Sequence, residues 1–142
     1  MSTLDLKTAQ DLTAAALAHA SAKGFKPLAV AVLDSRGALK AFVAQDGTSL
    51  KRGEIAVAKA SGAVAMGVGS RALGNQAAER PHFLAAASHL VGAFMPVAGG
   101  VLLKTADGIL LGAVGVSGDT SDNDEAAAIA GAESVGLVAD GG

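Results

Sequence analysis

The chain has 142 residues, a formal net charge of -2 at pH 7 and only 3% aromatic residues, so it has neither the basic surface nor the stacking rings of a nucleic-acid-binding protein. It contains no cysteine, which excludes disulfide bonds, thiolate catalysis and cysteine-ligated metals. Hydrophobic residues make up 51% and charged residues only 17%, so we expect part of the apolar surface to be hidden between copies in a homo-oligomer.

The length of the chain and the absence of a Pro/Gly/Ser-rich linker predict one domain over residues 1–142. The longest apolar runs, 93–103 and 109–116, are much shorter than the ~20 residues that a membrane-spanning helix needs. The first residues contain neither a basic leader nor an apolar export segment. We therefore expect a cytoplasmic protein without a membrane partner.

The first predicted element is a helix over Leu4–Lys23, because apolar residues recur there at helical spacing and Gly24 can supply a left-handed stop. Two segments of β-rich composition follow, 28–33 and 38–44. The turn between them ends at Gly37, which predicts a hairpin.

A second helix is predicted from about Leu50 to Val68, with very small side chains along its apolar stripe. Such a thin stripe indicates that the helix lies close to the sheet or to a neighbouring subunit. Gly74 and Asn75 are expected to break the chain. A short third helix is predicted over His82–Val91, with Pro81 in its first turn.

The segment 101–116 predicts a second hairpin, central in the sheet because it is apolar on both faces. A last helix is expected from Ser121 to about Gly136, with acidic residues at its positive end. The tail 139–142 is expected to fray. A hairpin followed by a capped helix thus occurs twice, which predicts one sheet covered by helices.

The order of several short motifs resembles that of the GlcG/HbpS-like family over nearly the whole chain. The motifs are Ala29–Asp34 with Gly37, Asp46–Gly47, Ile55–Ala60, Gly99–Val101, Gly112–Gly118 and Asp124–Glu125. The resemblance implies an α/β (α+β) profilin-like fold, in which helices cover a mostly antiparallel five-stranded sheet to give three layers. It also implies assembly into dimers or larger homo-oligomers.

Members of this family include haem-binding proteins and the C-terminal domain of PduO-type cobalamin adenosyltransferases, so the resemblance implies haem as a cofactor. The stretch 80–89 departs from the haem-bearing members, and no haem ligand is carried over by residue. No metal site is predicted from spacing. His82 and His89 lie seven residues apart, which is roughly 10 Å along a helix and too far for both to bind one ion. The acidic group after Gly118 lacks the pattern of a calcium loop.

Lys59 is the first candidate site residue, because it falls inside the apolar stripe of the second predicted helix. A cation is costly there unless an anion or a carbonyl group meets it. The functional interpretation is a ligand-binding or catalytic lysine. The structural alternative is a lysine that is paired with Asp46 or Glu54, or across a subunit contact.

Arg80 and His82 are the next candidates, because an arginine fork and an imidazole at a helix start can bind a carboxylate. The alternative for both is a solvated surface position. Gly99 and Gly100 can let a ligand approach bare backbone, with their amides as oxyanion donors. The alternative for this pair is a tight turn into a strand.

Two functions follow from these candidates. The first is a small-ligand-binding accessory protein that binds haem or another anionic tetrapyrrole in an apolar slot. His82 would be the axial ligand of the iron, and Arg80 or Lys59 would contact a propionate. His19 and His89 are competing candidates for the axial ligand. The second is a cofactor-free isomerase, lyase or similar proton-transfer enzyme for a small carboxylate, with Lys59 or His82 moving the proton. A structural oligomer with neither activity is the third possibility.

Overall fold

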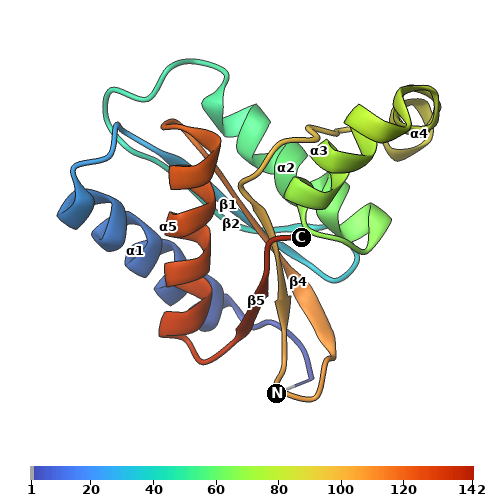
Figure 1. The fold of residues 1–142 in the computed structure, drawn as a ribbon. Helices are drawn as coiled ribbons and strands as arrows, with labels where there is room; N and C mark the ends of the chain where they lie inside the picture. Colours follow the sequence, from blue (N-terminus) through green and yellow to red (C-terminus); the bar gives the residue numbers. More distant parts are fainter. Residues whose placement is uncertain (1) are drawn as a thin grey trace.

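A computed structural model describes residues 2–142 and contains one five-stranded sheet, shown in Figure 1. The strands are β1 (Ala29–Asp34), β2 (Leu39–Ala44), β3 (Gly100–Lys104), β4 (Leu110–Ser117) and β5 (Val138–Asp140). Their order is β2-β1-β4-β3-β5, and every neighbouring pair is antiparallel. The expected antiparallel five-stranded sheet is confirmed, and both predicted hairpins are part of it.

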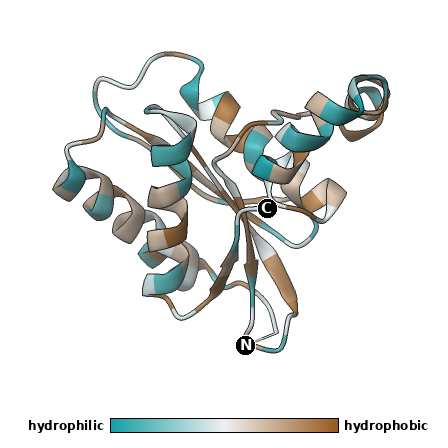
Figure 2. Cartoon of the chain, in the orientation of Figure 1, coloured by the Kyte–Doolittle hydropathy of each residue, from teal (hydrophilic) through white to brown (hydrophobic). Residues whose placement is uncertain are grey.

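Helices cover both faces of this sheet and form the expected three layers. Helices α1 (Leu6–Lys23) and α5 (Ser121–Ser134) pack together on one face, and α2 (Arg52–Met66) packs on the other (Figure 1). Side chains that alternate along β1 point to opposite layers: Val30 and Val32 join the core under α1 and α5, whereas Leu33 joins the core under α2. In Figure 2 the strands carry many of the most hydrophobic residues, and hydrophilic residues are frequent on the helices.

Helix α2 lies close to the sheet, as its small side chains predict. A Cβ atom added at Gly115 of β4 would overlap the carbonyl oxygen of Ala56 on α2, and one added at Gly100 would overlap the carbonyl oxygen of Lys59. Glycine at these two positions therefore allows the backbones of helix and sheet to touch.

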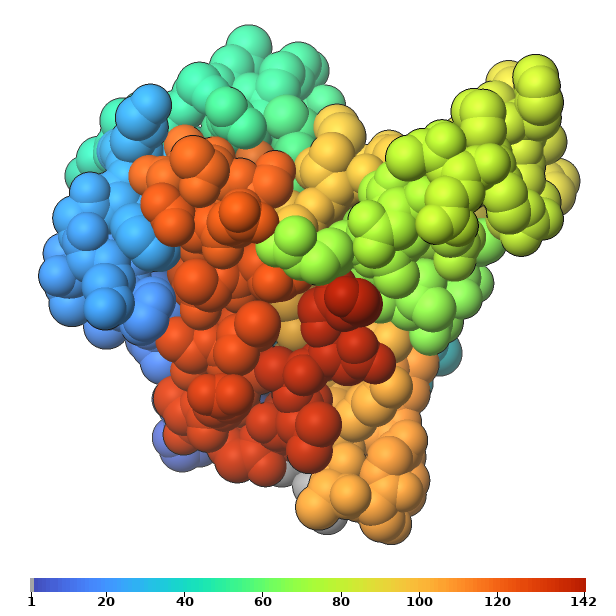
Figure 3. Space-filling view, viewed as in Figure 1, coloured from blue at the N-terminus to red at the C-terminus, as the bar shows by residue number. Residues whose placement is uncertain are grey.

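Helices α3 (Ser70–Glu79) and α4 (Pro81–Val91) form an arm that extends away from the sheet, at the upper right of Figures 1 and 3. The prediction that Gly74 and Asn75 break the chain is wrong, because both lie inside α3. Gly74 instead gives room to the carbonyl oxygen of Pro96, which would lie 2.8 Å from an added Cβ. This glycine serves a close approach and not a turn.

The chain end is ordered where a frayed tail was predicted, and this prediction is wrong. Strand β5 pairs with β3, with Ala139 opposite Leu103. The ammonium of Lys104 donates to the carboxylate of Asp140 at 2.8 Å and fixes the strand. The amide of Arg71 donates to the carbonyl oxygen of Gly141 at 3.2 Å, which ties the tail to α3.

Within residues 2–142, none of the helices combines the length and the apolar character that crossing a bilayer requires.

Candidate functional site

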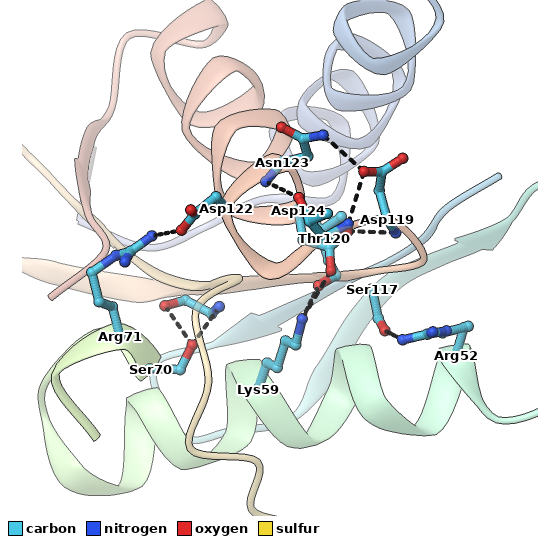
Figure 4. A network of polar contacts seen from close by, with 12 residues as sticks. Arg52, Lys59, Ser70, Arg71, Ser117, Asp119, Thr120, Asp122, Asn123 and Asp124 are labelled. Carbon is cyan, nitrogen blue, oxygen red and sulfur yellow. Dashed lines mark hydrogen bonds and ion pairs between the residues drawn. The ribbon is translucent and has the colours of Figure 1, made fainter. Parts of the chain in front are cut away.

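Lys59 takes part in a buried ion pair with Asp124 (Figure 4). Its ammonium donates to the Asp124 carboxylate at 3.1 Å and to the carbonyl oxygen of Val116 at 2.9 Å. The side chains are 2% and 0% exposed, respectively. Lys59 is therefore an ion-paired lysine, as the structural interpretation of the sequence expected. Its partner is Asp124, so the prediction of Asp46 or Glu54 as the partner is wrong.

The pair joins the two helical layers, since Lys59 comes from α2 and Asp124 from α5 (Figure 4). Burial lowers the pKa of Lys59 below its ordinary value, and the charge of Asp124 opposes this shift. Burial likewise raises the pKa of Asp124, against the hydrogen bond from the amide of Asp119 and the charge of Lys59. Since each charged group has a partner, the geometry favours an ion pair at neutral pH.

Gly99 and Gly100 lie directly beside Lys59. Gly99 has φ +126°, and a Cβ there would stand 2.8 Å from the Lys59 ammonium. The amide of Gly100 donates to the hydroxyl oxygen of Ser70 at 2.6 Å, so it is already used inside the protein. The glycine pair thus provides space for the buried lysine and for α2.

Arg80 and His82 lie in a different part of the molecule, where α3 ends and α4 begins, and both are exposed. The Arg80 guanidinium stacks on the ring of Phe83, with its central carbon 4.3 Å from the ring centroid. It forms no ion pair with residues 2–142. The structure thus groups Lys59 with Gly99 and Gly100, and Arg80 with His82, rather than all five.

The acidic residues at the start of α5 are engaged in contacts with the protein. Asp122 and Glu125 both bind the guanidinium of Arg71, with the Glu125 carboxylate 3.0 Å from its Nε. Asp119 accepts hydrogen bonds from the amides of Lys26 and Thr120 and from the side chain of Asn123. These bonds lower the pKa of Asp119 from 3.8 to about 2.

Sequence reasoning missed two surface features. One is a mostly apolar groove of about 590 Å³ between β2, α2 and the segment after α4; it is lined by Leu39, Phe42, Leu50, Gly53, Glu54, Val57 and Ala93. The other is Arg52, which begins α2 and donates to the buried hydroxyl of Ser117 at 3.2 Å. In the sequence, the segment just before α2, which includes the exposed Ser49 and Leu50, looks like an ordinary helix start and indicates neither feature.

The sequence matches a protein-family model, and the fold matches solved structures. The model of the family described as "Haem degrading protein HbpS-like" matches residues 4–133. The structure is similar to the crystal structure of a PduOC:haem complex, with 28% identity, a TM-score of 0.85, and coverage of 96% of this chain and 97% of that one. It is also similar to the crystal structure of HbpS, with 29% identity, a TM-score of 0.83, and coverage of 96% and 92%.

A third similar structure, the Klebsiella pneumoniae protein ORFY, shares only 22% identity at a TM-score of 0.82, with 95% and 92% of the two chains covered, and supports the fold alone. A comparison with curated proteins gave no match. The family match spans most of the chain, and the PduOC and HbpS structures both align over nearly its full length. This chain therefore belongs to the HbpS-like family.

Proposed function

We propose that this chain is a small-ligand-binding accessory protein that binds haem. The observation that carries the proposal is the close structural match, over 96% of this chain, to a relative whose crystal structure is a haem complex. The family description, which names a haem-degrading protein, points the same way.

The exposed residues at the start of α4 fit haem in their chemistry. Haem iron takes an imidazole nitrogen as an axial ligand, and a propionate binds an arginine fork. His82 supplies an exposed imidazole, and Arg80, held on the Phe83 ring, supplies a guanidinium without an ion pair in the described chain. We assign His82 the axial position and Arg80 the propionate contact.

The apolar groove beside α2 is a second surface that fits the macrocycle. Its lining is mostly apolar and includes Ala93, which follows the end of α4. His82 stands at the opposite end of α4, which is about 16 Å long. His89 lies closer to the groove along this helix, so it is the competing ligand for a macrocycle placed there.

The second candidate function, a cofactor-free proton-transfer enzyme, has less support. In the version that uses Lys59 rather than His82 to move the proton, it requires a free amine on Lys59, and an oxyanion contact at Gly100 requires a free amide there. The amine is bound to Asp124 and Val116, and the amide is bound to Ser70. Neither group is available to a substrate in this arrangement.

A haemin titration followed by absorption spectroscopy tests the proposal. We expect a saturable shift of the Soret band that is lost in His82→Ala and weakened in Arg80→Ala. His19→Ala and His89→Ala test the two competing ligands, because each removes one of the other imidazoles, and we expect both variants to keep the shift. A shift lost only in His89→Ala would move the site to the groove, and a wild-type titration without saturation would overturn haem binding.

We further propose that the chain forms a homo-oligomer. Leu50 and Leu90 are each 89% exposed, and contact with a second copy would bury their apolar side chains. Sedimentation velocity over a range of concentrations tests this; a single monomeric species throughout would contradict it. A cytoplasmic location stays a prediction of the sequence, and cell fractionation checks it.

A further inference from the structure

A small cavity of about 270 Å³ lies where three loops meet the start of α2. It is lined by Lys26, Pro27, Gly47, Ser49, Arg52 and Gly118. These residues come from the segment before β1, the segment before α2 and the segment after β4, so the fold brings together parts of the chain that are distant in sequence. The volume lies just below the ~300–1,000 Å³ of ordinary small-molecule pockets, so it suits a small ligand.

The charged side chains that line this cavity are both cations. Lys26 and Arg52 contribute two positive charges, and no carboxylate is among the described lining residues. Neither side chain forms an ion pair within residues 2–142. Because both cations line the same cavity, an anion bound there is attracted to each of them.

Arg52 is held in place by a buried partner. Its guanidinium donates to the hydroxyl oxygen of Ser117, which has no exposed surface (Figure 4). A guanidinium carries several N–H donors in a planar fork, and this bond uses only one of them. The remaining donors of a half-buried, positioned arginine are suited to a bidentate contact with an oxyanion.

Asp119, which follows the lining residue Gly118, and Asp124, which binds the amide of Asp119, are committed to other partners. Asp119 accepts from the backbone amide of Lys26 at 2.7 Å, and not from the Lys26 ammonium. Asp124 is bound to Lys59 and to the amide of Asp119. The start of α2 adds the positive end of a helix dipole, since Lys51 provides no side-chain cap there.

We propose that this cavity is a binding site for a small oxyanion, a carboxylate or phosphate group. Arg52 would grip two of its oxygens, Lys26 would neutralise it, and the hydroxyl of Ser49 would supply a further donor. The site shares no residue with the proposed haem contacts at Arg80 and His82. The oxyanion is either a free small molecule or the carboxylate of a larger ligand such as a haem propionate.

Isothermal titration calorimetry with inorganic phosphate, acetate and malonate, at matched ionic strength and without haem, tests the site. We expect saturable binding of at least one of these anions to the wild-type chain. Arg52→Gln should weaken its affinity about tenfold or more, because a charge-assisted bidentate contact is lost. Lys26→Gln, which removes an exposed side chain and leaves the core intact, should weaken it as well.

Lys51→Gln is the matched control, because it removes the same charge one residue earlier from a lysine that is paired with Glu54 and does not line the cavity. An equal loss in this variant, or no saturable binding to the wild type, would overturn the site. Circular dichroism of Arg52→Gln separates lost binding from lost folding.

A haemin titration of Arg52→Gln distinguishes the two sources of the oxyanion. Weaker haemin binding, together with competition between phosphate and haemin, identifies a propionate at this site. Unchanged haemin binding identifies a free small molecule. If wild-type protein binds phosphate but not haemin, the proposed function fails while the oxyanion site stands.

Discussion

At the scale of single residues, the buried contact between Lys59 and Asp124 is the interaction whose disruption should matter most. Lys59→Met removes the cation and leaves a buried carboxylate without its partner. We expect a loss of about 3–5 kcal/mol in the free energy of unfolding, because breaking one side of a buried ion pair exposes the full desolvation cost of the other. Urea denaturation at neutral pH measures it.

The double variant Lys59→Met with Asp124→Leu should recover much of this loss, since it leaves no buried charge. Lys51→Met is the control, because its pair with Glu54 is exposed and should contribute little. A Lys59→Met variant as stable as the wild type would contradict this expectation.

Asp119 should make the free energy of unfolding fall at low pH. Its folded pKa of about 2 lies below the unfolded value of 3.8, so its stabilising effect is complete above 3.8 and is lost as the pH falls toward 2. Between about pH 4 and pH 2, the wild type should therefore lose more stability than Asp119→Asn. Thermal unfolding of both proteins across this range measures the difference, and parallel curves would contradict it.

Sequence reasoning located Lys59 as a buried position but not its partner. Its place in an apolar helical stripe was visible in the local pattern, whereas Asp124 is 65 residues away and is reached only through the fold. Asp124 itself looked like an ordinary acidic residue at a helix start. The same holds for Arg52 and Ser117, which the three-dimensional arrangement alone brings together.

At the scale of secondary-structure elements, the contact between α2 and the sheet depends on glycine. Gly115→Ala should destabilise the protein by about 1–3 kcal/mol or more, because the new methyl group meets the rigid backbone of Ala56. Gly53→Ala, in the first turn of α2, is the matched variant: its methyl group meets only the ring of Phe42, a partly exposed side chain that can move.

We expect Gly53→Ala to be neutral or stabilising, since alanine favours the helix over glycine. Chemical denaturation of both variants measures the contrast. Equal effects would show that α2 can shift away from the sheet.

Elements with strong local signals were predicted well, and those defined by contacts were not. Gly24 ends α1 in the left-handed conformation, as its position predicted. Helix α3 was missed because Gly74 has the local signature of a break but is needed for packing against Pro96. Strand β5 has only three residues, too few for an alternating pattern, and pairing with β3 defines it.

At the scale of the whole molecule, the arm formed by α3 and α4 should be less stable than the body. Helix α4 packs mainly on α3, and this part of the chain projects from the body in Figure 3. Phe83 and Leu90 on α4 are exposed. We expect the amides of α4 to exchange with solvent through local opening, at free energies well below that of global unfolding. Hydrogen exchange measured by mass spectrometry tests this, with α2 as the internal reference. Equal protection of α2 and α4 in a dilute monomer would contradict it.

The overall architecture could be predicted because many weak motifs occur in one order, and the family match and the five-stranded antiparallel sheet agree with it. The positions of the candidate residues could not. Lys59 and Arg80 are both cations in or near helices, yet one faces the sheet and the other faces solvent. That difference arises from the way α3 and α4 leave the body, which no local pattern encodes.

The link between α2 and α5 has a consequence for synthesis on the ribosome. Lys59 leaves the ribosome well before Asp124, which neutralises it. Until Asp124 has emerged, burial of the Lys59 ammonium is unfavourable, because the charge would lose its hydration without gaining a partner. A nascent chain that ends before α5 should therefore hold α2 away from the sheet and stay open to protease. Compaction of the body is expected only once the second hairpin and its following helix have left the exit tunnel.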